Sequence, residues 1–208
     1  MLQVTQNDNG KGMVSGEFVS MTALHNAAPK LVPVPIAWGT YATDSNIHFF
    51  LCSFVDMTDD LPDPNKLGAM LADLHQRTVS PNGKYGFSVP TYQGTIPQRV
   101  DWQDTWEVFF SNMMRRILDH ELASQGPDEE LDQLTQALLE KVIPRLLRPL
   151  ETGGRKIQPR LVHGDIWDGN TSTDAATDLP VIFDATCLYA HNESKLDDPI
   201  HNLAKEGR

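Results

Sequence analysis

Cysteine is scarce in this chain of 208 residues, which contains only Cys52 and Cys187. Both lie in apolar surroundings without metal-ligand spacing, so we expect reduced core residues rather than a disulfide framework or a zinc site. Apolar runs stay far short of the ~20 residues that cross a bilayer. No secretory segment is recognisable either. These absences predict a soluble protein of the cytoplasm.

Basic residues are in the minority, because 17 Lys and Arg face 28 Asp and Glu and give a formal net charge of −11. Such an excess of negative charge repels nucleic acids and anionic membranes, and it removes both from the expected partners. The length suits one large domain or two small lobes, and an apolar content of 40% is enough to bury a core.

Three polar residues late in the chain have a spacing typical of phosphate chemistry. The stretch from Leu161 to Asn170 reads LVHGDIWDGN, and the apolar run that follows closes at Asp184. Phosphoryl transfer needs a carboxylate that accepts the proton of the attacking hydroxyl, and oxygen ligands that hold magnesium against the phosphates. Asp165 suits the first role, and Asn170 with Asp184 suits the second. Each piece alone is often a structural turn or strand end, but the three in this order favour the functional interpretation.

Several further segments carry recognisable motifs. They read MVSGEF from Met13, LADLH from Leu71, KYGF from Lys84, WQDTWEVFF from Trp102 and YAHNE from Tyr189. Together with HGDIWDGN and PVIFDA, these segments resemble the fructosamine kinases, also called ketosamine-3-kinases or protein-ribulosamine 3-kinases. The resemblance extends from about the first residues to Glu193.

This resemblance implies an α+β, protein-kinase-like (aminoglycoside-phosphotransferase-like) fold of two lobes. A shortened N-lobe would span residues 1–57 and end in the hinge. A mainly helical C-lobe with the catalytic loop and the metal-binding aspartate would span residues 58–208. The resemblance further implies ATP and Mg²⁺ as cofactors and phosphorylation of the sugar O3 of ribulosamines or fructosamines, on protein amines or as small ketosamines. Because the 3-phosphate makes the adduct labile, the activity would be a deglycation repair.

The resemblance also implies roles for individual residues. Asp165 would be the catalytic base, and magnesium would be held by Asn170 and Asp184. The ATP site would be formed by Glu17 and, in the hinge after a strand predicted over residues 47–54, by Phe54, Val55 and Met57. Weaker candidates for the substrate site are Trp167, His191 and Glu193.

The residue expected to pair with Glu17 is replaced. In protein kinases a helix glutamate pairs with a strand lysine that holds the ATP phosphates, but the corresponding position here is Gln3. Glutamine does not replace an ammonium group on a phosphate. Three interpretations follow: an impaired kinase, rescue by Lys11 from a turn predicted over residues 6–12, or a shortened start. The alternative function is therefore a catalytically impaired kinase-like remnant that binds a nucleotide or a partner protein.

Hydrophobic spacing predicts the remaining elements. A helix with one buried face is expected over Met13–Leu24, another after the turn of residues 58–64, and a hairpin around residues 172–179. Residues 79–98 are expected to form a loop that, by the resemblance, borders the acceptor site with Lys84, Tyr85 and Phe87. Asp101 is expected to cap a helix with an aromatic stripe, in which one of the tryptophans Trp102 and Trp106 could form a wall for the acceptor. A helix from Pro127 is expected to bury an apolar face in a bundle, made of Leu131, Leu134, Leu138, Val142, Leu146 and Leu150.

Overall fold

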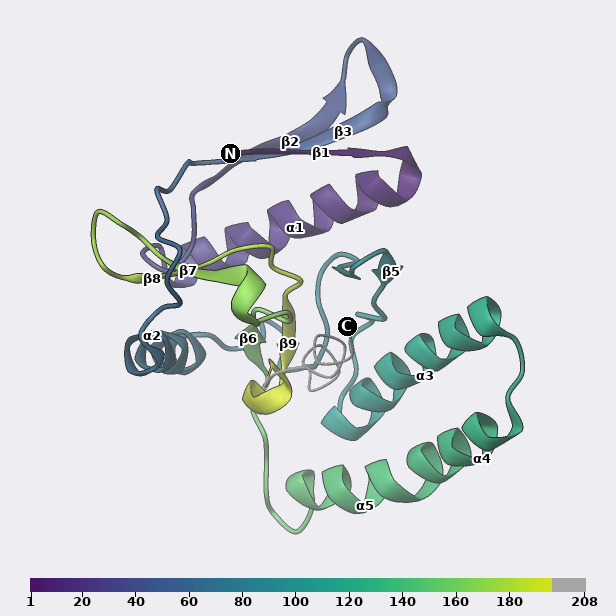
Figure 1. Ribbon diagram of the computed structural model, residues 1–208. Helices are drawn as coiled ribbons and strands as arrows, with labels where there is room; N and C mark the ends of the chain where they lie inside the picture. The colour runs from purple at the N-terminus through teal and green to yellow at the C-terminus, as the bar shows by residue number, and fades with distance from the viewer. Residues whose placement is uncertain (196–208) are drawn as a thin grey trace.

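The first part of the chain folds into an antiparallel sheet with one long helix against it (Figure 1). The computed structural model describes residues 1–195. Strands β1 (Leu2–Gln6), β2 (Pro35–Tyr41) and β3 (Asp44–Cys52) form the sheet in the order β1-β3-β2, and helix α1 (Asn7–Ala27) packs against it. Alternate residues of β3, namely His48, Phe50 and Cys52, are buried, as the two-residue period of a half-covered strand requires.

Helix α1 begins earlier than the sequence suggests, so the turn predicted over residues 6–12 is wrong. Asn7 follows β1 directly with a φ of 67°, a conformation that Asn tolerates better than most residues. Its side-chain oxygen accepts a hydrogen bond from the backbone N–H of Gly10 at 3.1 Å. A Cβ atom at Gly10 would lie 2.8 Å from Cβ of Thr5. The glycine that resembles a turn signal is therefore required for close packing of the helix on β1.

The remainder of the described chain is mainly helical, with short two-stranded sheets between the helices. Its helices are α2 (Pro64–Arg77), α3 (Trp106–Gln125), α4 (Glu129–Ala137) and α5 (Ile143–Leu147). Its strands pair as β4 (Tyr92–Gln93) with β5 (Ile96–Pro97), β6 (Arg160–Val162) with β9 (Leu188–Ala190), and β7 (Thr171–Thr173) with β8 (Pro180–Ile182). The β7–β8 pair confirms the predicted hairpin. Short helical turns are η1 (Leu138–Val142, π-helical), η2 (Arg148–Glu151), η3 (Asp168–Asn170) and η4 (Asn192–Lys195).

One hydrophobic core connects the two parts. Residues from α1, α2 and the central β6–β9 pair contribute to it, for example Leu24, Leu74 and Leu161, which are at most 1% exposed. Cys52 and Cys187 are free and buried, which confirms that both are reduced core residues. None of the helices within residues 1–195 combines the length and the apolar character needed to cross a bilayer.

Helix α3 begins at Trp106, and its cap differs from the prediction. Oγ1 of Thr105 accepts a hydrogen bond from the backbone N–H of Val108 at 3.3 Å, so Thr105 rather than Asp101 is the N-cap. Trp102 therefore precedes the helix. Trp106 is buried against other aromatic rings, with its centroid 5.6 Å from that of Tyr85, and it belongs to the core rather than to a substrate wall.

The apolar face predicted over α4 and α5 does not enter a bundle within the described residues. Leu134 is 61% exposed and Leu146 is 62% exposed. Figure 1 shows these helices as an arm that runs back beside α3. The π-helical turn η1 stands immediately before α5, where Pro144 cannot donate the regular helical hydrogen bond. The prediction of a buried face is therefore wrong within residues 1–195: helical periodicity marks an apolar stripe, but its burial depends on packing partners that the pattern does not record.

Candidate functional site

The loop that carries Asp165 is held by a turn that only glycine can form. Gly164 follows β6 with a φ of 89°, and a Cβ atom there would lie 2.2 Å from the carbonyl oxygen of Thr186. Nδ1 of His163 accepts a hydrogen bond from the backbone N–H of Asp165 at 3.3 Å. The proton of a neutral imidazole is then on Nε2, which lies 3.0 Å from the carbonyl oxygen of Phe183 and donates to it. His163 thus joins the Asp165 loop to the chain just before Asp184.

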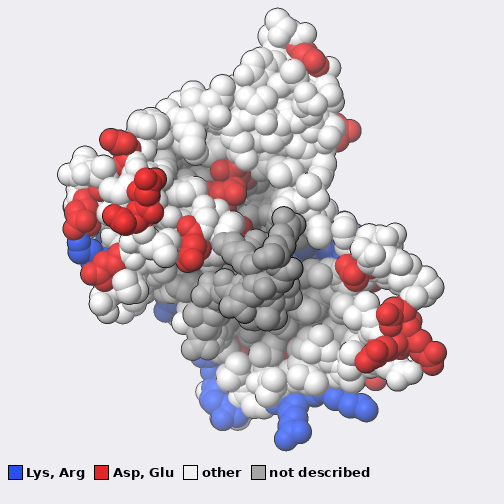
Figure 2. Space-filling view, in the orientation of Figure 1, with Lys and Arg blue, Asp and Glu red and all other residues white. Residues whose placement is uncertain are grey.

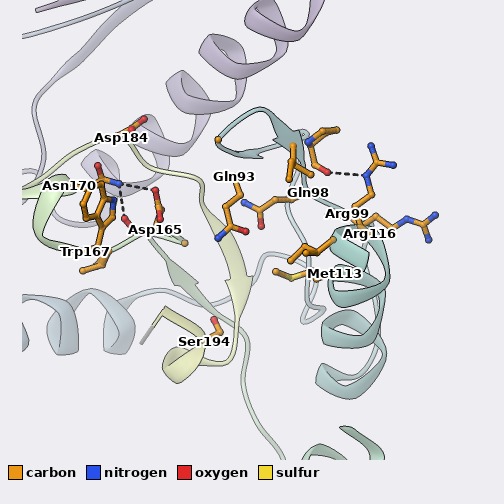
Figure 3. A pocket seen from close by; sticks show the side chains of 16 residues that line it. Gln93, Gln98, Arg99, Met113, Arg116, Asp165, Trp167, Asn170, Asp184 and Ser194 are labelled. Carbon is orange, nitrogen blue, oxygen red and sulfur yellow. Dashed lines mark hydrogen bonds between the residues drawn. The ribbon is translucent and has the colours of Figure 1, made fainter. Parts of the chain in front are cut away.

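Asn170 fixes the orientation of Asp165. Its Nδ2 donates to the backbone oxygen of Asp165 and to Oδ2 of the same residue, both at 2.9 Å. Because both partners accept hydrogen bonds, the amide nitrogen must face them, and the amide oxygen must face the other way. Figure 3 shows this oxygen on the side of Asp184. Asn170 itself is 4% exposed, so its amide is held firmly in place.

Asp184 lies at the end of the segment that leaves β8 and has a φ of 58°. A left-handed conformation in a residue other than glycine costs on the order of 1 kcal/mol and clusters at functional sites. Partial loss of solvent around the carboxyl group raises its pKa above the ordinary value. The backbone thus places this acidic side chain in the lining of the same cavities as Asp165 at an energetic cost.

A cavity of about 620 Å³ opens in front of these residues (Figure 3). Asp165, Asn170 and Asp184 all line it, together with Trp167. The sequence therefore identified three polar residues that the fold does bring together. Within residues 1–195 no group of three or more His, Cys, Asp or Glu side chains is arranged to hold a metal ion by itself. One carboxylate and one amide oxygen instead make an incomplete set of hard oxygen ligands, which suits Mg²⁺ shared with phosphates and water.

A smaller cavity of about 110 Å³ adjoins the first, and Asp165 and Asp184 line both. Gln3 and Glu17 contribute to its polar lining, as do Tyr92 and Thr186. Burial raises the pKa of Glu17 to about 8, the negative charge of Asp184 adds to the rise, and a hydrogen bond from the side chain of Gln3 opposes it. Gln3 thus occupies the position beside Glu17 where a lysine was expected. The described residues that line this cavity include no Lys or Arg.

The remaining ATP-site predictions concern residues outside both cavities. Phe54 is 78% exposed after β3, and Met57 forms an isolated bridge with Asp174 of the β7–β8 hairpin. Together with Val55 they stay a predicted hinge. Lys11 is exposed on α1 rather than in a loop, and it lines neither cavity, so the structure gives no support to its proposed rescue role.

Of the described residues predicted for the substrate site, only Trp167 lines the large cavity. The His191 ring packs against Trp106 with a centroid distance of 6.2 Å. Glu193 lies in η4, but its side chain is outside the described part of the structure. Tyr85 and Phe87 are buried. They do not line the cavity, and neither does Lys84, which pairs with Asp104 at 2.9 Å.

The sequence predicted that residues 79–98 border the acceptor site, but it did not single out the residues that form the cavity wall facing Asp165. This wall comes from the β4–β5 hairpin, the chain after it and one face of α3, and it includes Gln93, Gln98, Arg99, Met113, Arg116 and Ile117. The only signal in the sequence was that Met113, Arg116 and Ile117 share one face of a helix. The loop residues carried no periodicity that could have singled them out.

Comparison with known proteins gives consistent results. The model of a family described as fructosamine kinase matches residues 2–198. A chloroplastic protein-ribulosamine 3-kinase from Oryza sativa subsp. indica is 30% identical over 186 residues, covering 89% of this chain and 52% of that protein. Ketosamine-3-kinase from Mus musculus is 30% identical over 217 residues, covering 94% of this chain and 67% of that protein. The chain therefore spans about half to two thirds of the length of these curated relatives.

Two crystal structures share the fold. A protein from Haemophilus somnus 129PT assigned as fructosamine-3-kinase gives a TM-score of 0.69 at 20% identity, with coverage of 92% of this chain and 60% of that one. A protein from Thermobifida fusca YX-ER1 with the same assignment gives a TM-score of 0.64 at 23% identity, with coverage of 92% and 62%. These likenesses confirm the predicted α+β, protein-kinase-like fold.

Proposed function

Since this chain belongs to the fructosamine kinase family, we propose that it transfers the γ-phosphoryl group of ATP to the sugar O3 of a ketosamine. The acceptors would be ribulosamines or fructosamines, on protein amines or as small molecules. This substrate class corresponds to the names of its relatives in rice and mouse. Phosphorylation at O3 would mark the adduct for release of the amine, which makes the activity a repair step.

The observation that carries this proposal is the arrangement of Asp165, Asn170 and Asp184 around one cavity. Asn170 holds Asp165 through two hydrogen bonds of 2.9 Å and directs its own amide oxygen toward Asp184. Such pre-organisation matters because phosphoryl transfer depends on positioning and electrostatic stabilisation more than on covalent chemistry by the protein.

Each residue has a distinct proposed role. Asp165 would orient the acceptor hydroxyl and take its proton. The hydrogen bond from Asn170 holds the carboxylate of Asp165 in one direction for this role. Asn170 and Asp184 would hold Mg²⁺, which when bound neutralises charge on the phosphates. Trp167 lines the same cavity and would border the sugar. Glu17 and the hinge residues Phe54, Val55 and Met57 would form the ATP-binding site.

The division into lobes at residues 57 and 58 is also a proposal. After β3 ends at Cys52, the chain runs to the β7–β8 hairpin. There Met57 forms a bridge with Asp174, and the N–H of Thr58 donates to the carbonyl oxygen of Thr173 at 2.9 Å. The sheet and α1 precede this crossing, and α2 follows it. The prediction of a cytoplasmic location stays open, and the rice relative is named chloroplastic.

A second candidate function is nucleotide binding without transfer. One observation favours it: Gln3, a neutral side chain, stands beside Glu17 where kinases place the lysine that holds the phosphates. Loss of that charge weakens the positioning of ATP, but it leaves the metal and base residues in place.

Phosphate transfer followed by ³¹P NMR separates the candidates. The full chain is incubated with Mg²⁺, ATP and ribulosyl- or fructosyl-propylamine, and a sugar phosphate is the expected product. Asp165→Asn is expected to lower kcat roughly 10²- to 10⁴-fold because it removes the proton acceptor. Asp168→Asn, an exposed residue of the same loop that lines neither cavity, is the control.

Three outcomes decide between the proposals. Turnover that depends on Asp165 supports the kinase. Absence of turnover together with a magnesium-dependent rise of Tm in ATP supports the second candidate. A chain that neither turns over nor responds to Mg²⁺ and ATP contradicts both.

A further inference from the structure

The inner wall of the large cavity opposite Asp165 carries amide groups rather than charges. Gln93 and Gln98 line the cavity, and Figure 3 shows both amides between the loop of Asp165 and helix α3. The side chains of Arg99 and Arg116 extend away from this space in the same view. The net charge of the protein is −11, and Figure 2 shows acidic side chains over α2 and the β7–β8 hairpin with basic ones along α5. The neutral wall therefore suits the uncharged part of a polar ligand.

Gln98 carries a hydrogen-bond donor that the fold leaves unused. Its Nε2 is buried and has no hydrogen-bond partner among residues 1–195. An unpaired buried donor costs free energy, and an acceptor oxygen of a ligand would remove that cost. The terminal torsion of a glutamine side chain is soft, so the N–H₂ group can turn toward the cavity without giving up an existing bond within the described residues. Gln98 is therefore poised to donate to a bound molecule.

The backbone on both sides of Gln98 is held in place. Its own N–H donates to the carbonyl oxygen of Thr91 at 2.8 Å, and Thr91 is 1% exposed. The carbonyl oxygen of the preceding residue, Pro97, accepts a hydrogen bond from Nε of Arg116 at 3.3 Å. Val100, two positions further on, is buried. The amide of Gln98 thus projects from a fixed platform, as a residue that discriminates between ligands requires.

Apolar side chains around Gln98 match the carbon skeleton of a sugar. Ile96, Met113 and Ile117 line the same cavity and offer surface to C–H groups, whereas the amide offers a donor to hydroxyl oxygens. The cavity of about 620 Å³ lies within the range of roughly 300–1,000 Å³ typical of small-molecule sites. It can therefore hold a sugar together with part of the amine that carries it.

We propose that Gln98 determines which sugars the acceptor site accepts: its Nε2 donates to a sugar hydroxyl other than O3 while O3 lies at Asp165. The inference rests on the proposed kinase function for the position of O3. A donor at a fixed place favours the sugar whose hydroxyl comes within its reach. An epimer that turns this hydroxyl away leaves the donor unpaired, and it is bound more weakly for that reason. Gln98 thus reads the configuration of one sugar carbon.

Equilibrium binding measured by calorimetry without ATP tests the proposal without requiring turnover. The ligands are the propylamine ketosamines of D-fructose, D-tagatose and L-sorbose. Tagatose differs from fructose only at C4 and L-sorbose only at C5, so all three have the same charge, size and configuration at C3. The Kd values of the full chain are expected to spread roughly 5- to 20-fold, as for one hydrogen bond gained or lost at a buried donor. The weakest ligand identifies the carbon that Gln98 reads.

Matched variants locate the discrimination. Gln98→Met keeps the length of the side chain without the donor, and it is expected to narrow the spread of Kd values to less than about twofold. Gln103→Met is the control, because Gln103 is also half-buried but lines neither cavity. Since the donor of Gln98 is unpaired, Gln98→Met should unfold in urea at the same or a higher midpoint than the wild type. If it misfolds by circular dichroism, Gln98→Glu, which replaces the donor by an acceptor, carries the test.

Equal affinity of the wild-type chain for the three ligands overturns the proposal, and so does a spread that survives in Gln98→Met. A narrowed spread with a lower urea midpoint assigns Gln98 a structural role instead and also overturns it. Phosphate transfer to fructosyl-propylamine is measured separately by ³¹P NMR. Transfer without a spread that depends on Gln98 leaves the kinase proposal standing and rejects this one. A spread that depends on Gln98 without any transfer rejects the kinase and leaves the sugar site.

Discussion

Replacement of Glu17 by glutamine should make the protein more stable at alkaline pH. Glu17 has a pKa of about 8 in the folded protein, mainly because it is buried, against an ordinary value of 4.5. Between these values the folded chain keeps a proton that the unfolded chain has lost. Unfolding in this interval therefore releases a proton, and a rising pH favours that release. The stability that the proton contributes to the folded state thus falls as pH rises and is fully lost above about pH 8. The glutamine introduced by Glu17→Gln carries no charge at any pH and avoids this loss.

The magnitude follows from the same two values. The interval from 4.5 to about 8 corresponds to an upper limit of about 4.8 kcal/mol in the free energy of unfolding. Because the small cavity gives Glu17 some access to solvent, we expect roughly 2–4 kcal/mol. Glu17→Gln and the wild type should have similar stability near pH 5 and differ by this amount at pH 9.

Urea unfolding followed by circular dichroism at several pH values between 5 and 9 measures the difference. Glu130→Gln, an exposed residue of α4, controls for the general effect of replacing an acid by an amide. The two pH profiles of wild type and Glu17→Gln should diverge as pH rises. Parallel profiles would show that Glu17 ionises without cost and would refute the reasoning about its burial.

Three further predictions concern the same region and its support. Gln3→Lys places a cation beside Glu17, so it should lower the pKa of that residue and flatten the dependence of Tm on pH; an unchanged slope would contradict the pairing. Gly164→Ala puts a Cβ atom 2.2 Å from a backbone oxygen at a φ of 89°, and urea unfolding should show a loss of roughly 2–4 kcal/mol, whereas a loss below ~0.5 would contradict the fit. Tyr85→Phe removes a 2.7 Å hydrogen bond to the carboxylate of Glu151 and should cost about 1.5–3 kcal/mol in the same assay; a neutral result would mean that this bond contributes nothing.

The central site was accessible from the sequence because its three residues are set by local rules. A glycine turn after β6 places Asp165, the short helical turn η3 places Asn170, and β8 ends shortly before Asp184. The order and spacing of the three residues therefore sufficed to predict their convergence, although their chemical roles stay proposals.

Other features depended on contacts that no local pattern records. Gly10 belongs to α1 because it packs against Thr5, although its neighbours read as a turn. Arg99 lies on an irregular segment, so its place at the cavity follows from tertiary packing alone. Leu134 has helical periodicity, yet it is exposed in the described structure. For Gly10 and Leu134 the local pattern indicated an environment other than the observed one, and for Arg99 there was no pattern to use.

The effect of Mg²⁺ on ATP affinity, measured by calorimetry for the wild type and Asp184→Asn, tests the central claim most directly. If Asp184 and Asn170 hold the metal against the phosphates, Mg²⁺ should tighten ATP binding to the wild type, and Asp184→Asn should lose at least tenfold of that gain, about 1.4 kcal/mol. Asp168→Asn should retain it. An Asp184→Asn variant that keeps the full magnesium effect would contradict the claim that these residues form one metal and phosphate site.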